Sequence, residues 1–191
     1  MRKLGLASLA FFYCDFREDQ KKDIRGLLSS LLVQLGHQSD PYCDVLFKLY
    51  LEHANGSRQP SDEVLVECLK EMLKLPGQAP VYFIMDALDE CPITSSLPSP
   101  RDKVLMFVEE LIASQLPNLR ICVTSRPETD IKVVLYPLTF HFISLHDECG
   151  QMDDIENYIK SVVDADQMMR RWNAADKQLV IAVLTNKAHG M

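Results

Sequence analysis

Residues 81–91 read VYFIMDALDEC, and they carry the strongest indication of the fold. Five apolar residues are followed by three acids within five positions, Asp86, Asp89 and Glu90. A short continuous apolar run is typical of a strand covered on both faces, as in a parallel sheet. The stretch therefore predicts a buried strand that ends in a group of carboxylates.

The rest of the chain alternates between similar apolar runs and helical patterns. Further strands are expected at residues 9–14, 120–124 and 140–145. Helices are expected over the leucine-rich stretch 24–36, after Asp40, after Ser61 and after Pro100, with two more beyond residue 151. This order predicts an α/β fold with a mostly parallel sheet, followed by C-terminal helices. The expected boundary divides a core of residues 1–150 from a helical region of residues 151–191.

The three acids suit a metal-assisted site, because ligands of open α/β sheets bind beyond the carboxyl ends of the strands. Asp86, the first acid, is placed to hold a hydrated Mg²⁺, which keeps several waters and needs few protein oxygens. Glu90 is placed to orient or deprotonate an attacking water. Asp89 either helps to hold the metal through a bound water or positions the neighbouring loop. The alternative is a strand that ends in a solvated acidic turn.

A second group of polar residues follows the next expected strand, with the order Thr124-Ser125-Arg126-Pro127-Glu128. The intervening helix makes the two strands a plausible βαβ pair, so Arg126 is expected at the same edge of the sheet as Asp86. A guanidinium there can contact a terminal phosphate through charge-assisted bonds. The alternative is an exposed loop arginine paired with Glu128.

Composition narrows the class of protein. The chain has 191 residues, a hydrophobic content of 47% and a formal net charge of -7, which suit one domain without a broad nucleic-acid surface. The six cysteines form no C-x-x-C pair, so a disulfide framework or zinc site is not expected. No apolar run approaches the roughly 20 residues of a membrane span. These features favour a cytoplasmic protein.

The two polar groups, taken in order with flanking segments, resemble the NACHT domain of STAND P-loop NTPases. The closer resemblance is to the nephrocystin-3-like N-terminal form found in fungal proteins of the heterokaryon-incompatibility type. It rests on the segments AFFYCDF at residues 10–16, RGLLSSLLVQL at 25–35, MDALDEC at 85–91, TSRPE at 124–128 and NKAHGM at 186–191.

The resemblance implies a fold, a set of roles and a set of ligands. The fold would be a P-loop NTPase three-layer sandwich, here incomplete. Asp86 would be the Walker B metal-side acid, with Asp89 nearby, and Glu90 the catalytic position. Arg126 would be the sensor, with Thr124 and Ser125 beside the nucleotide. The implied ligands are Mg²⁺ and ATP or GTP, in a signalling or non-self-recognition protein.

The sequence departs from that family at the phosphate-binding loop. None of the seven glycines opens a G-x-x-x-x-G-K-[ST] motif, which supplies the amides and lysine that cradle the phosphates. We therefore expect a module that does not hydrolyse ATP alone. The strand that precedes such a loop is expected to be missing beside the Walker B strand. Expected partners are other NACHT chains or a missing N-terminal segment, not nucleic acid or membrane.

Two other functions stay open at this point. One is a protein-interaction module that docks on intact NACHT proteins, because a missing strand leaves an exposed sheet edge. The weaker one is a metal-dependent phosphoesterase or nuclease that uses Asp86, Asp89 and Glu90, because two-metal sites employ clustered acids.

Overall fold

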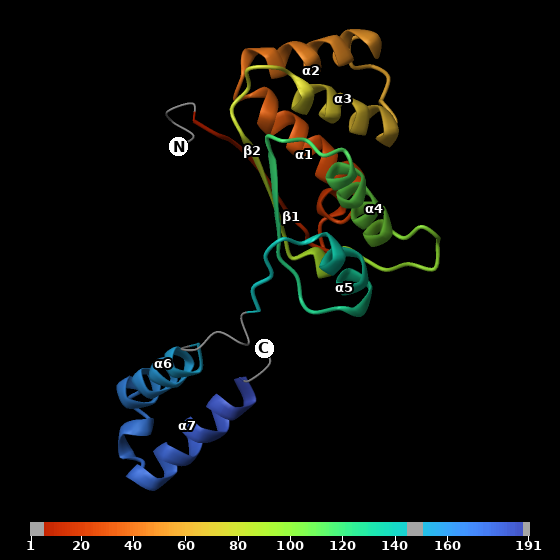
Figure 1. Ribbon diagram of the computed structural model, residues 1–191. Coiled ribbons are helices and arrows are strands. Elements are labelled where there is room, and N and C mark those ends of the chain that lie inside the picture. The colour runs from red at the N-terminus through yellow and green to blue at the C-terminus, as the bar shows by residue number, and fades with distance from the viewer. Residues whose placement is uncertain (1–5, 145–150, 189–191) are drawn as a thin grey trace. The chain divides into compact units, whose positions relative to one another are not determined.

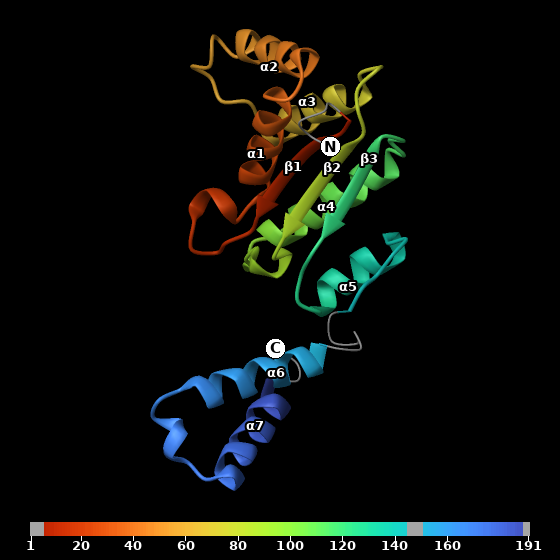
Figure 2. The ribbon, with the colours of Figure 1, turned by 90° about the vertical axis from the view of Figure 1, so that its left-hand side faces the viewer.

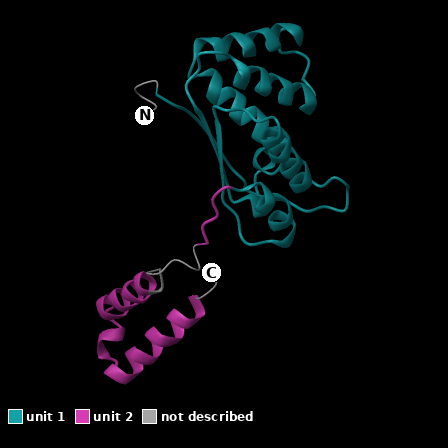
Figure 3. Cartoon of the chain, viewed as in Figure 1, with its two compact units in different colours: residues 1–139 teal, residues 140–191 magenta. Residues whose placement is uncertain are grey.

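The computed structural model describes residues 6–144 and 151–188. The chain divides into two compact units, residues 1–139 and 140–191, which are described separately (Figure 3). The boundary expected at residue 150 falls within residues 145–150, which lie outside the described part.

Unit 1 is built on a parallel sheet of three strands in the order β1-β2-β3 (Figure 1). The strands are β1 (Ser8–Tyr13), β2 (Val81–Asp86) and β3 (Leu119–Val123). The register pairs Tyr13 with Asp86 and Met85 with Val123. The α/β class and the parallel sheet are confirmed. The gap expected beside the acid-bearing strand is wrong, because β2 is paired on both sides.

Three helices of unit 1 begin after a residue whose side chain caps them. Asp23 accepts a hydrogen bond from the Gly26 amide, Ser61 accepts one from the Val64 amide, and Ser99 forms a capping box with Asp102. A short helix after β3 was not expected from the sequence. The helices are α1 (Ile24–Gly36), α2 (Asp40–Glu52), α3 (Asp62–Lys74), α4 (Pro100–Ala113) and α5 (Thr129–Leu135).

Within residues 6–139, helices cover one face of the sheet and leave the other open (Figure 2). Phe83 and Met85 of β2 are fully buried, whereas Tyr82 and Ile84 between them are 43% and 36% exposed. The expectation that this strand is covered on both faces is therefore wrong for this part of the chain. The expected three-layer sandwich is likewise reduced to two layers in residues 6–139, since no helix of this part covers the face that carries Tyr82 and Ile84 (Figure 2).

The two edges of the sheet differ in their hydrogen bonding. The side-chain amide of Gln38 accepts from the Leu9 amide at 2.9 Å and donates to the Leu9 carbonyl at 2.8 Å. Gln34 makes the same pair of bonds with Phe11, at 3.1 and 2.7 Å. Gln34 lies on α1 and Gln38 in the turn that follows it, so this helix and its C-terminal turn close the outer edge of β1. Along β3, no bond from the described residues reaches the outward backbone groups of Ile121 and Val123.

Unit 2 consists of α6 (Gln151–Ala165) and α7 (Ala174–Ala188), which pack against each other. The strand expected at residues 140–145 is wrong for residues 140–144, which form neither a strand nor a helix; Leu145 lies outside the described part. On α6, Tyr158 and Val162 are 70% and 45% exposed, because two helices bury only a narrow line of contact. None of the described helices combines the length and apolarity needed to cross a membrane.

Candidate functional site

The carboxyl end of β2 is joined to the segment after β3 through Thr124. The Thr124 hydroxyl donates to Oδ1 of Asp86 at 2.5 Å, and its oxygen accepts from the Ala87 amide at 3.1 Å. Its backbone amide donates to the Met85 carbonyl at 2.9 Å, and its carbonyl accepts from the Leu88 amide at 3.0 Å. One residue therefore fixes both the direction of the Asp86 carboxylate and the start of the turn that follows.

That turn, residues 87–91, is called here the acid turn, and it begins with an unusual backbone conformation. Ala87 has φ 54° and ψ 48°, the left-handed region that residues with a Cβ rarely adopt. The conformation costs about 1 kcal/mol or more. It reverses the chain so that Leu88 returns to the core with no exposed surface, while Asp89 and Glu90 follow in a single 3₁₀ turn. The neighbours of the turn must hold it in place.

Asp89 connects the acid turn to Arg126. Its Oδ1 accepts from the Arg126 amide at 2.9 Å, and its Oδ2 lies 3.5 Å from Nε of the same residue. The Asp89 side chain is 10% exposed, whereas that of Arg126 is 79% exposed. The contacts match the second of the two roles considered for Asp89, positioning of the neighbouring loop. Among the described residues, Arg126 forms its ion pair with Asp89 and not with Glu128, the partner named in the alternative.

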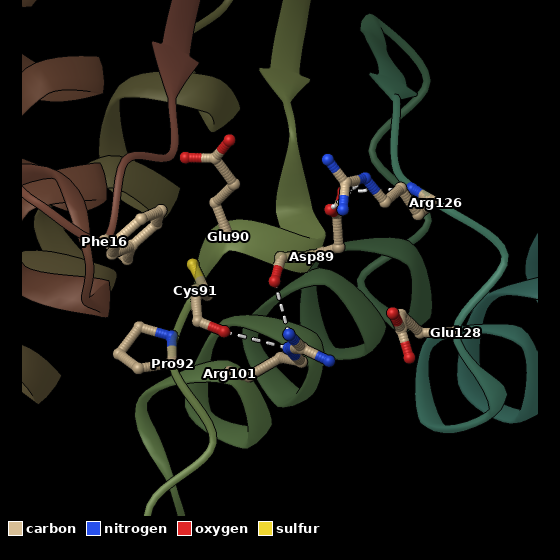
Figure 4. Close-up of a pocket in the computed structure, with 8 residues that line it drawn as sticks. All are labelled: Phe16, Asp89, Glu90, Cys91, Pro92, Arg101, Arg126 and Glu128. Atoms are coloured by element: carbon tan, nitrogen blue, oxygen red, sulfur yellow. Dashed lines mark hydrogen bonds and ion pairs between the residues drawn. The ribbon is translucent and has the colours of Figure 1, made fainter. Parts of the chain in front are cut away.

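Glu90 projects into a hollow that the close-up shows between the acid turn and the segment after β1 (Figure 4). Its carboxylate receives no hydrogen bond from the described residues, and Phe16 lies across the hollow. Arg17 contributes positive charge nearby. The hydrogen bond from Arg17 to Asp15 is the main reason that the pKa of Arg17 is raised, and Glu90 adds to the effect. Glu90 is thus half-buried with an unengaged carboxylate.

Arg101, in the first turn of α4, forms hydrogen bonds to the backbone of the acid turn. Its Nε donates to the Cys91 carbonyl at 2.9 Å, and Nη2 donates to the Asp89 carbonyl. Its Nη1 lies 3.2 Å from Oδ2 of Asp130 on α5. The side chain is only 8% exposed, so all three contacts are made by a buried charge. Figure 4 shows the guanidinium beneath the turn, facing the two carbonyls.

Two thiols meet beside the acid turn. Sγ of Cys91 and Sγ of Cys14 are 3.4 Å apart, and both residues are buried and free. The Cys14 amide also donates to the Asp86 carbonyl at 3.0 Å, which continues the ladder of β1 and β2. The hydrogen bond with Cys91, followed by burial, raises the pKa of Cys14, so this thiol is protonated at neutral pH.

The site residues suit one hydrated cation better than a metal ion that is held by several protein ligands. Oδ2 of Asp86 accepts no hydrogen bond from the described residues and is available to a metal-bound water or to the ion itself. No group of three acidic, histidine or cysteine side chains that could hold a metal occurs in the described part of the chain. Mg²⁺ takes one or two carboxylates and completes its shell with water and phosphate oxygens, so one such acid suffices. The clustered acids that a two-metal phosphoesterase needs are not brought together here.

The structure brings all six sequence-predicted site residues to one edge of the sheet. Asp86, Asp89 and Glu90 follow β2, and Thr124, Ser125 and Arg126 follow β3. The Ser125 hydroxyl donates to the Arg126 carbonyl at 2.9 Å, a local contact within its own loop. The roles assigned to these residues stay predictions, whereas their location at one edge of the sheet is observed.

Arg101 and Asp130 were missed by sequence reasoning. A signal was present, because Arg101 lies one residue after Pro100 at the start of a helix. A positive charge is unfavourable at a helix N-terminus, where the macrodipole is also positive. Such a residue needs an acceptor nearby, and the acid turn ten residues earlier supplies two carbonyls.

A family model described as Nephrocystin 3, N-terminal, matches residues 2–126 of the chain. The match includes the three strands, the acid turn and Arg126. No curated protein and no solved structure matches the chain.

Proposed function

The chain belongs to the nephrocystin 3 N-terminal family, and from this premise we propose that it forms the metal-binding and phosphate-sensing side of a NACHT-type nucleotide site. Asp86 holds a hydrated Mg²⁺, Glu90 orients the attacking water, and Arg126 contacts the terminal phosphate. Thr124 and Ser125 lie beside the nucleotide, which is ATP or GTP. The module acts in the cytoplasm as part of a signalling protein.

One observation carries this proposal: two polar contacts join the end of β2 to the segment after β3. The Thr124 hydroxyl binds the Asp86 carboxylate, and the Asp89 carboxylate binds Arg126. These contacts bring a carboxylate with a free oxygen and an exposed guanidinium to one edge of the sheet. The carboxylate is at the end of β2, and the guanidinium is in the segment after β3. Opposite charges so placed suit a metal–phosphate ligand, which presents a cation and anionic oxygens together.

The same proposal includes a limit on activity. The 191 residues contain no glycine-rich loop with a lysine, so they supply no amide cradle for the phosphates. Removing a single preorganised donor from a catalytic site costs about 10²–10³ in rate. We therefore propose that these residues alone do not hydrolyse ATP, and that a phosphate-binding loop comes from another segment or another chain.

Hydrolysis and metal dependence provide the test. The 191-residue chain is assayed for Mg²⁺-dependent phosphate release from ATP and GTP, alone and fused after a strand–loop–helix segment that carries G-x-x-x-x-G-K-[ST]. We expect no turnover by the chain alone and Mg²⁺-dependent nucleotide binding by the fusion. Asp86→Asn in the fusion should lower that binding at least tenfold. Asp44→Asn, a change at an exposed acid of α2 without a partner among the described residues, is the matched control.

Two results would contradict the proposal. Turnover by the unfused chain that Asp86→Ala abolishes would overturn its inactivity. Equal loss of Mg²⁺-dependent binding in the Asp86 and Asp44 variants would remove Asp86 from the metal site.

A second candidate function, docking on intact NACHT proteins, is favoured by the open edge of β3. Bonds from Asn118 and Thr124 face β2, so the alternation of a parallel ladder points the backbone groups of Leu119, Ile121 and Val123 away from it. Within the described residues, Ile121 and Val123 have free backbone groups at this edge. An added strand would satisfy them.

Mixing experiments separate this candidate from the first. Sedimentation of the chain with an intact family member, from 1 to roughly 100 µM, should show a new complex if docking occurs. Ile121→Pro, which removes an outward amide, should weaken the complex, whereas Leu6→Pro outside the strands should not. Unchanged monomer sedimentation across this range would count against docking.

A further inference from the structure

Arg101 and Arg126 both contact the acid turn, and their surroundings are opposite. The Arg126 side chain is 79% exposed and has one acidic partner, so it is free to meet a ligand. The Arg101 side chain is 8% exposed and is engaged on three sides. A guanidinium whose donors are already used within the protein does not bind a ligand. Arg101 therefore contributes by fixing the backbone groups that it binds.

What Arg101 holds are the carbonyl groups on either side of Glu90. Nη2 takes the carbonyl of Asp89, and Nε takes that of Cys91. Within the turn, the Glu90 amide donates to the Ala87 carbonyl at 2.9 Å and the Cys91 amide donates to the Leu88 carbonyl at 3.1 Å. The backbone of Glu90 is therefore fixed by its own turn and, from outside, by one side chain. The Glu90 carboxylate has no hydrogen bond of its own in the described part of the chain, so its position depends on this backbone.

The third contact of Arg101 extends the same support to the segment after β3. Asp130 lies in the first turn of α5, four residues beyond Arg126. The ion pair between Arg101 and Asp130 thus ties the turn that carries Glu90 to the helix that follows the Arg126 loop. A buried ion pair is weak evidence for stability, because desolvation offsets its attraction. What the ion pair does establish is a direct connection between these two segments.

We propose that Arg101 is a positioning residue for Glu90: by binding the carbonyls of Asp89 and Cys91, it fixes the place from which the Glu90 carboxylate acts. The assignment of an action to Glu90 rests on the proposed function. Planar, paired donation to two carbonyls requires a guanidinium, so lysine does not replace it.

The first measurement follows amide hydrogen exchange in the full chain and does not depend on nucleotide chemistry. Arg101→Lys keeps the charge and removes the paired donation. We expect the Glu90 and Cys91 amides to exchange at least tenfold faster, with Phe83 and Met85 in the centre of β2 unchanged. Asp130→Asn keeps both carbonyl contacts and should accelerate the same amides less. Arg58→Lys, at an exposed loop arginine, is the matched control.

The outcomes of this arm decide the proposal in either direction. Faster exchange confined to Glu90 and Cys91 supports positioning. Uniform acceleration that includes Phe83 and Met85, or no change in the turn, overturns it. If Arg101→Lys does not fold, Arg101→Met takes its place in the same comparison, because an apolar side chain of similar length removes the carbonyl contacts without leaving a buried charge. No acceleration at Glu90 and Cys91 in that variant would overturn the proposal.

The second measurement links Arg101 to the metal side of the site and uses Mn²⁺ alone as the probe. In the wild-type chain, carbon-13 resonances of the Asp86 and Glu90 carboxyl groups should both broaden on addition of Mn²⁺. In Arg101→Lys, Asp86 should broaden as before while broadening of Glu90 falls at least twofold. Loss of global stability alone would not separate these two signals. Equal broadening of Glu90 in both proteins would overturn the proposal, whereas no broadening of Asp86 in the wild type would refute the metal site and leave the exchange result to judge Arg101.

Discussion

Strand β1 and strand β3 lie at opposite edges of the same sheet, and they differ in what meets their outward backbone groups. At β1, the side-chain amides of Gln34 on α1 and Gln38 in the turn after it bind the backbone amides and carbonyls of Leu9 and Phe11. At β3, Ile121 and Val123 meet nothing in the described part of the chain. Unpaired edges invite added strands, and proteins block them where addition is harmful. The β1 edge of this sheet is therefore closed to an added strand, whereas the β3 edge is open.

Removing both glutamines should have the largest effect on this contrast. The double change Gln34→Leu and Gln38→Leu deletes the four bonds to the β1 backbone, together with those from Gln34 to the Ser30 hydroxyl and from Gln38 to the Gln34 carbonyl. We expect the free energy of unfolding to fall by roughly 2–4 kcal/mol. The bared β1 edge should also cause self-association. Urea unfolding and sedimentation measure the two effects.

The control for that experiment replaces Gln20 and Gln59 with leucine, since both are exposed and neither side chain has a hydrogen bond in the described residues. Equal behaviour of the two double variants would show that Gln34 and Gln38 do not close the β1 edge.

Amide exchange in the wild-type chain should show the contrast directly. The Leu9 and Phe11 amides donate to glutamine oxygens, whereas those of Ile121 and Val123 face solvent, so we expect the first pair to exchange roughly tenfold more slowly. The difference should disappear in the double leucine variant. Similar rates at both edges of the wild type would refute the assignment of β3 as the open one.

The smallest expected effect separates the two glutamines from each other. The bonds of Gln38 are partly buried, whereas those of Gln34 to Phe11 are exposed. Since a bond shielded from water is costlier to lose, Gln38→Leu should destabilise more than Gln34→Leu, by about 0.5 kcal/mol. Chemical unfolding of the two single variants measures the difference, and the reverse order would contradict it.

The sequence predicted the parts of the fold that depend on local pattern. The apolar run before Asp86 and the one before Thr124 became neighbouring strands, so the six candidate residues meet at one edge as expected. The family match over residues 2–126 confirms the resemblance that these motifs carried. Patterns of this kind are read from short windows, because strand and helix periodicity repeat within a few residues.

The parts that failed depend on contacts between distant segments. Val81 to Met85 is uniformly apolar, yet only alternate residues are covered by helices, and no local signal reports how many layers surround a strand. Residues 140–144 have strand-like composition but do not form a strand. Gln34 and Gln38 look like ordinary polar positions at the end of a helix, and their bonds to the edge of β1 become visible only when α1 is packed along that strand.

The left-handed backbone of Ala87 makes the acid turn depend on the elements around it. A residue with a Cβ held at φ 54° is in a conformation that the free chain avoids, so the turn is a local arrangement maintained from outside. Released from these neighbours, Ala87 would leave that conformation, and the positions of Asp86 and Glu90 relative to each other would change. The spacing of these two carboxylates is thus a property of the assembled unit and is lost whenever β2, β3 and α4 part. Chemistry that requires both acids is thereby confined to the folded protein, and a partly unfolded intermediate carries none of it.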